Sequence, residues 1–371
     1  MKFSLRYTKK PKLFIFSCLF FAGFFAGSHA HAQDLTPATA TKLAELRTQV
    51  RTWAPICADG SFTTDIRNCP FGDMLEFAGI LCLSGEKDRC DDVKRSQDPV
   101  TGRWWRSPGK VGENVAWASF SRDMAQGVFA YLVATEDTDA GEKWMDYIES
   151  NNNRLCPVSQ EGSDACETRA GFWSQARQVW DYLGLPRRKR MKGFKVLIDK
   201  LYSPIEVVFQ PHDYPLHLDA DSVYTHQKME ESGYRIANTE TKKIIAHEIS
   251  SKEPMNPFFY YLDNGVTEWG AQLILQACPT QLPPNDIIHD WIWQRGFNFR
   301  EKGSAFRNWD YASGWECIFA VNLLIGPEAE APDAKPKAID TEVVAPDLTV
   351  GEISAPLSLI DMPAPSLTYS L

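Results

Sequence analysis

Between residues 73 and 316 the chain repeats one pattern six times, in which a polar or aromatic segment runs directly into a compact apolar stretch. The repeat length is about 50 residues, which is typical of stacked supersecondary units such as helical hairpins. The apolar stretches begin at or beside six residues: Asp73, Asp123, Trp173, Asp219, Glu268 and Glu316. The repeat therefore predicts an all-α fold, in which about six helical hairpins close as a ring with their apolar helices inside.

The N-terminal residues are typical of an export signal. Five basic residues precede the apolar run 13–27, and Ala30-His31-Ala32 supplies small side chains for cleavage. The apolar run is shorter than the roughly 20 residues of a membrane span, and no later stretch approaches that length. We therefore expect a signal peptide over residues 1–32, with an uncleaved anchor as the alternative. The mature protein is expected to be periplasmic or secreted, without a membrane span.

The cysteines agree with export. Of the nine cysteines, only Cys18 lies in the predicted signal, and an even number in an exported chain favours disulfides over metal or redox chemistry. Short intervening loops suggest three pairs, which leave a fourth: Cys57–Cys69, Cys82–Cys90, Cys156–Cys166 and Cys278–Cys317. No cofactor and no metal site are expected.

Residues 327–371 differ in composition from the rest of the chain. They are rich in proline and acidic residues and have no amphipathic period, so we expect a disordered tail after a single domain over residues 33–326. The full chain has a net charge of −9, and about −8 remains on the domain once the basic signal and the acidic tail are set aside. This balance disfavours nucleic acid as a partner, because nucleic acid is bound mainly through its phosphates.

Acidic residues begin five of the six apolar helices, and a ring would gather them at one face. A carboxylate in a first turn is also explained by the helix dipole, with roughly 0.3–1 kcal/mol of stabilisation. Neighbouring tryptophans favour a functional interpretation, because indole rings stack on sugars while carboxylates take part in glycoside cleavage. Asp73 and Asp123 are the predicted catalytic pair, with Glu316 and Asp310 as competitors. The predicted substrate-binding residues are Trp104, Trp105, Arg106, Trp117, Arg122, Trp173, Glu268, Trp269 and Trp309.

Repeated helical hairpins with aromatic and acidic loops resemble the α/α-toroid glycoside hydrolases and polysaccharide lyases. The resemblance covers most of residues 38–325 and is architectural, since the chain contains no motif of one specific family. It implies a site in a cleft at one end of the inner barrel, lined by residues 103–123 and 308–316.

The leading hypothesis is an exported glycoside hydrolase that acts on an oligo- or polysaccharide by carboxylate acid/base catalysis. A lyase on the same scaffold is one alternative, with His212, Tyr214, His217 and His226 as possible bases. A non-catalytic protein that binds glycan or protein is another. The segment 217–221 also contains possible metal ligands, but ligands two residues apart diverge on a helix, so a metal site is not predicted there.

Overall fold

The computed structural model of the chain describes residues 35–63, 74–113, 120–157, 166–192, 214–236, 239–281 and 314–328. Within these ranges the regular structure is helical, and the only β-type pairing consists of three isolated bridges. This confirms the predicted all-α class. None of the helices in these ranges has the length and apolarity that crossing a membrane requires. The described residues belong to one compact unit that runs to Glu328.

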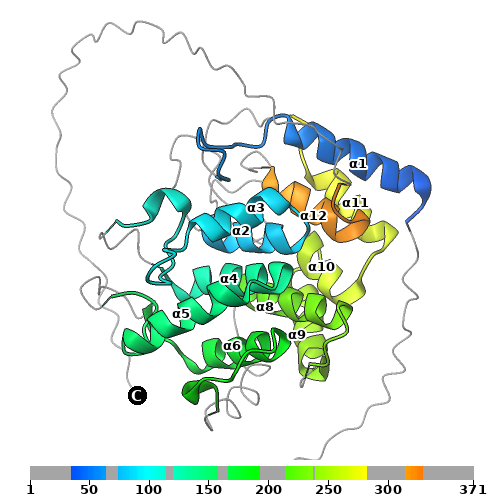
Figure 1. Cartoon of the computed structure of the whole chain (residues 1–371). Coiled ribbons are helices and arrows are strands. Elements are labelled where there is room, and N and C mark those ends of the chain that lie inside the picture. The colour runs from blue at the N-terminus through cyan, green and yellow to red at the C-terminus, as the bar shows by residue number, and fades with distance from the viewer. Residues whose placement is uncertain are drawn as a thin grey trace, which may run out of the picture. The chain divides into compact units, whose positions relative to one another are not determined.

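Figure 1 labels the helices in chain order. The α-helices are α1 (Pro37–Arg51), α2 (Met74–Leu83), α3 (Lys87–Arg95), α4 (Arg122–Thr135), α5 (Thr138–Ser150), α6 (Ala170–Tyr182), α8 (Tyr214–Glu231), α9 (Thr239–Lys252), α10 (Pro257–Asn264), α11 (Glu268–Ala277) and α12 (Trp315–Ile325). Two short 3-10 segments, η2 (Pro108–Lys110) and η6 (Lys189–Lys192), complete the list.

The closest helix contact joins α2 to α4, which lie side by side in Figure 1. A Cβ atom placed on Gly79 would lie 2.0 Å from the carbonyl oxygen of Gly127, and one on Gly127 would lie 2.1 Å from the carbonyl oxygen of Leu75. Only glycine permits two helix backbones to approach this closely. The pair therefore fixes how the first turns of α2 and α4 lie against each other.

Aromatic side chains fill the space between α8, α10 and α12. The rings of Phe258 and Phe319 lie 5.0 Å apart between centroids, and Tyr224 lies edge-on to both, at 5.9 Å and 5.6 Å. Such edge-to-face pairs add stability beyond the apolar area that they bury. Since α8 also packs against α2 and α4, these helices share one continuous core.

The first and last helices of the described unit pack against each other. Arg47 of α1 is buried and donates to the side-chain oxygen of Asn322 at 2.8 Å and to the carbonyl oxygen of Gly326 at 2.6 Å. The amide of Asn322 donates in turn to Glu86, which also pairs with Arg51 at 2.6 Å. Polar side chains thus tie α1 and α12 to the start of α3.

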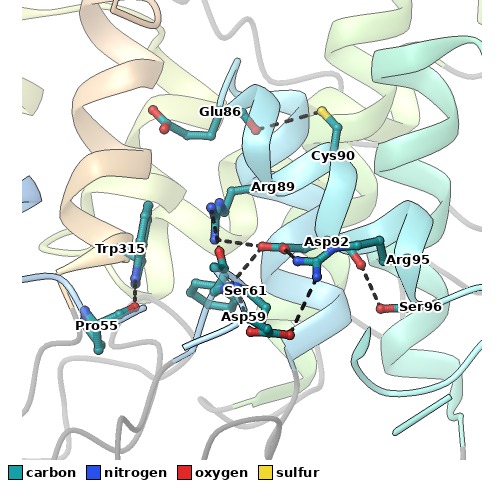
Figure 2. A network of polar contacts seen from close by, with 12 residues as sticks. Pro55, Asp59, Ser61, Glu86, Arg89, Cys90, Asp92, Arg95, Ser96 and Trp315 are labelled. Carbon is teal, nitrogen blue, oxygen red and sulfur yellow. Dashed lines mark hydrogen bonds and ion pairs between the residues drawn. The ribbon is translucent and has the colours of Figure 1, made fainter. Parts of the chain in front are cut away.

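A second buried polar network fastens the segment 54–63 to α3 (Figure 2). Asp92 accepts hydrogen bonds from the backbone N–H of Phe62 at 3.0 Å and from Arg95 at 2.6 Å, and it pairs with Arg89 at 2.7 Å. The indole N–H of Trp315 donates to the carbonyl oxygen of Pro55 at 2.8 Å. The segment is therefore held to both α3 and α12.

Disulfides connect the helices as the spacing predicts. The bonds Cys82–Cys90, Cys156–Cys166 and Cys278–Cys317 are present, and the last joins the end of α11 to the start of α12. Cys57 is also disulfide-bonded, whereas its predicted partner Cys69 lies outside the described residues. Disulfides of this kind are compatible with an extracellular protein.

Helices α2, α4, α11 and α12 begin at or beside the residues that the repeat predicts. Ser121 is the N-cap of α4 and accepts from the backbone N–H of Met124. The prediction was wrong for α8, which begins at Tyr214 rather than near Asp219. The contacts of α8 reach both α2 and α4, so a simple sequential ring is not established by the described helices.

Candidate functional site

Three buried ionisable side chains meet between α2 and α8. Glu76 belongs to α2, while His217 and Asp221 belong to α8. The Nε2 atom of His217 lies 3.5 Å from Oε1 of Glu76 and 3.3 Å from Oδ2 of Asp221, and all three side chains are 0% exposed. One N or O atom from each residue lies within 4.8 Å of the other two. We call Glu76, His217 and Asp221 the buried triad.

Local structure explains why these three residues meet. His217 and Asp221 are four residues apart on α8 and therefore lie on the same face of that helix. Glu76 is the one charged residue of α2, whose sequence is otherwise apolar and which is packed by neighbours on several sides. A Cβ atom on Gly127 would lie 2.6 Å from the Cα atom of Glu76, so α4 holds this turn of α2 in place.

The surroundings of His217 are apolar. The ring of Phe77 lies 5.9 Å from that of His217 and the ring of Phe258 lies 6.2 Å from it, both edge-on. Burial in these surroundings lowers the pKa of His217 to about 3, because the charged imidazolium would lose its hydration. The imidazole is therefore neutral at physiological pH and has a ring nitrogen with a free electron pair.

Asp221 is a fully buried carboxyl group. Burial raises the pKa of Asp221 well above its usual value, and the charge of Asp123 raises it further, while a hydrogen bond with Glu76 acts in the opposite direction. Outside the triad, no residue in the described ranges donates a hydrogen bond to either oxygen of Asp221. No lysine or arginine of those ranges forms an ion pair with it either.

Asp123 is brought close to the triad from a third helix. It lies in the first turn of α4, where it is partly exposed, and its charge acts on Asp221 of α8. Its neighbour Arg122 is also partly exposed. Acidic residues of α2, α4 and α8 thus interact electrostatically, whereas the predicted partner of Asp123, Asp73, lies outside the described residues.

The acidic residues of the last two helices have different surroundings. Glu316 lies in the first turn of α12 and is 0% exposed. Glu268, at the first turn of α11, accepts hydrogen bonds from the backbone N–H of Thr36 at 2.5 Å and from the hydroxyl of Thr39 at 2.8 Å. These bonds lower the pKa of Glu268 and attach it to the start of α1.

Three of the four predicted tryptophans that the structure describes belong to the core. Trp104, Trp105 and Trp173 are at most 6% exposed. The indole N–H of Trp105 donates to the carbonyl oxygen of Glu113. Of the predicted tryptophans that the structure describes, Trp269 alone is half exposed. The buried rings are explained by packing, since a sugar needs an accessible ring face.

Arg106 lies in the loop before η2. The backbone carbonyl of Arg106 accepts from the N–H of Leu75 at 3.1 Å, which joins its loop to the start of α2. Several candidates lie outside the described residues: Asp73, Asp310, Trp117, Trp309 and His212.

One member of the triad was missed in the sequence, and the other two were noticed but misjudged. Glu76 was treated as part of an apolar helix and not as a candidate site residue. A single glutamate among apolar residues nevertheless indicates a buried polar site, because buried glutamates are rare unless they have a partner. His217 and Asp221 were considered as metal ligands. Their spacing of four residues places them on one face only if the helix begins before His217, and the predicted helix began near Asp219. Comparisons of the chain with protein-family models, with curated proteins and with solved structures found no match.

Proposed function

We propose that this chain is an exported enzyme that cleaves an oligo- or polysaccharide, with Asp123 as one of two catalytic carboxyl groups. The proposal includes the predicted ring of helical hairpins as its scaffold. In glycoside hydrolysis one carboxyl group protonates the leaving oxygen, and a second carboxylate acts as nucleophile or as base toward water. Asp73 is proposed as the second group, with Glu316 and Asp310 as competitors.

The observation behind the proposal is the position of Asp123, which lies partly exposed in the first turn of α4 and whose charge contributes to the raised pKa of Asp221 on α8. An acidic residue that only complements a helix dipole needs no such neighbour, because its partners are the free N–H groups of its own first turn. Asp123 is also partly exposed rather than fully buried, so a bound molecule can reach it. A position beside other acids and open to solvent suits a group that exchanges a proton with substrate.

The test compares two first-turn aspartates. Asp123→Asn keeps the shape of the side chain but removes its ability to exchange a proton, and we expect at least a 100-fold loss of sugar release from a glycan panel. Asp139→Asn is the matched control, because Asp139 is an acidic residue in the first turn of α5 and is exposed. Both variants should keep the helix content and the melting temperature of the wild type.

The same assay separates the alternatives. Hydrolysis releases reducing ends without ultraviolet absorbance, whereas a lyase leaves a double bond that absorbs. Saturable binding of a glycan without any product would identify a binding protein. Full activity in a folded Asp123→Asn protein would remove Asp123 from the mechanism.

A further inference from the structure

The buried triad has the composition and spacing of a metal site. We propose that Glu76, His217 and Asp221 bind one divalent transition-metal ion of the Zn²⁺ or Mn²⁺ kind. The proposal is independent of the carbohydrate function above, because it concerns binding of the ion alone. It also departs from the sequence analysis, which predicted no metal.

The distances between the donor atoms fit coordination of one ion. Zn²⁺ binds imidazole nitrogen and carboxylate oxygen at about 2.0–2.2 Å, so two ligands of a tetrahedral ion lie roughly 3.3–3.6 Å apart. The two distances from Nε2 of His217 are 3.3 Å and 3.5 Å. Both exceed the roughly 2.7–2.9 Å of a charge-assisted hydrogen bond. The imidazole nitrogen therefore lies at ligand spacing from both carboxyl groups, which also share a hydrogen bond with each other.

The ligand types select the class of ion. Imidazole nitrogen suits Zn²⁺ and carboxylate oxygen suits both Zn²⁺ and Mn²⁺, whereas sites for Ca²⁺ and Mg²⁺ consist of oxygen ligands alone. The described cysteines are bound in disulfides and supply no thiolate. Two carboxylates and one neutral imidazole together carry a charge of −2, which one divalent ion neutralises.

Burial supplies a second and independent observation. Asp221 is 0% exposed, and outside the triad no described residue donates a hydrogen bond to it. An ionised carboxyl group in such a place loses its hydration and needs a cation or a proton as compensation. A cation between Glu76, His217 and Asp221 contacts the carboxyl oxygen that faces the imidazole.

The main competing arrangement is a shared proton in place of the ion. In that arrangement the triad is a hydrogen-bonded group that excludes metal. The two arrangements differ in what they predict for the wild-type protein: bound Zn²⁺ in one case and indifference to Zn²⁺ in the other.

The experiment is titration of the full, chelator-treated protein with Zn²⁺, followed by calorimetry and by metal analysis after dialysis. We expect about one ion per chain, and at least a 100-fold weaker affinity in Asp221→Asn and in His217→Gln. The matched control is His226→Gln, because His226 is also a buried histidine of α8 but lies outside the triad. This control should bind Zn²⁺ as the wild type does.

Spectroscopy of the wild type decides the proposal even where a variant fails to fold. X-ray absorption of the Zn²⁺ form should show one imidazole nitrogen with oxygen ligands and no sulfur, and the melting temperature should rise on addition of Zn²⁺. A wild type that binds no ion would overturn the proposal. Unchanged binding in folded Asp221→Asn and His217→Gln proteins would overturn it as well, and would point to surface groups such as His247 and Asp263.

Discussion

Asp92 and Asp221 are both almost completely buried aspartates on helices, yet their partners differ in kind. Asp92 is surrounded by donors: two arginines and a backbone N–H address its oxygens (Figure 2). Asp221 faces Glu76 and a neutral imidazole. A buried charged group whose counter-charge belongs to the same chain stabilises a particular packing of that chain. A buried ionisable group that has no counter-charge within the chain indicates a site for a bound ion or ligand. The first site is structural, and the second is the candidate for binding.

The largest loss of stability is expected at Asp92, whose counter-charges belong to the same chain. Asp92→Asn would leave the buried guanidinium of Arg89, which is 5% exposed, without its anion, so we expect a loss of about 3–5 kcal/mol in the free energy of unfolding. Denaturant unfolding measures this loss. As a control, Glu240→Gln breaks an exposed pair of the same i,i+3 spacing and should change stability by less than about 0.5 kcal/mol. Equal effects in the two variants would contradict the structural role of Asp92.

The next effect concerns the glycine contact that holds the triad. Gly127→Ala places a Cβ atom 2.1 Å from a backbone carbonyl oxygen of α2, so the helices must separate, and we expect a loss of about 3 kcal/mol. Gly141→Ala is the matched control, because its Cβ atom would meet ordinary contacts at 3.6 Å and alanine favours helix. Thermal unfolding should therefore move in opposite directions for the two variants.

A third effect distinguishes the two buried histidines of α8. Burial lowers the pKa of His226 well below its usual value, with a smaller contribution from Lys242, so below about pH 6.5 the unfolded chain binds more protons than the folded chain. Stability from this group is thus fully present above about pH 7 and is lost as the pH falls, by roughly 2 kcal/mol at pH 5.

His226→Gln should remove this share of the pH dependence and leave that of His217. Unfolding free energies measured between pH 5 and pH 8 test the expectation. An unchanged slope in the variant would show that His226 is protonated equally in the folded and unfolded chains.

The smallest effect is expected at Asp221 in metal-free protein. Asp221→Asn replaces a buried carboxyl group whose pKa burial raises and with which no described lysine or arginine pairs, so stability should stay within about 1 kcal/mol of the wild type. Denaturant unfolding in the presence of a chelator measures it. A loss as large as that expected for Asp92→Asn would erase the distinction between the two aspartates.

The sequence predicts where helices begin better than it predicts which helices pack against each other. Ser121 before α4 and Thr267 before α11 are N-caps whose side chains accept from the first turn, and such caps are local and visible in the chain. The start of α8 was misplaced because the proline-flanked segment that ends at Pro215 was interpreted as a loop, whereas Tyr214 and Pro215 already belong to α8. Five residues of error there concealed the i,i+4 relation of His217 and Asp221.

The members of the candidate site were not predicted from the sequence, because the site depends on contacts between helices that are distant along the chain. Tryptophans in predicted loops were assigned to a ligand, but Trp104 packs edge-on to Tyr131 at 6.0 Å and belongs to the core. Nothing in the sequence states that α8 lies against both α2 and α4. The proximity of Glu76 to His217 follows from that contact, which local patterns do not encode.

The packing of α1 against α12 has a consequence for biosynthesis. The chain is synthesised from its N-terminus. The residues that contact Arg47 are therefore made 275 and 279 residues after it, and the buried face of α1 has no partner until then. The bond between Cys278 and Cys317 likewise forms only after both helices have emerged. A nascent chain that stops short of α12 leaves the apolar side chains on one face of α1 uncovered, which makes it a substrate for chaperones until the final segment arrives.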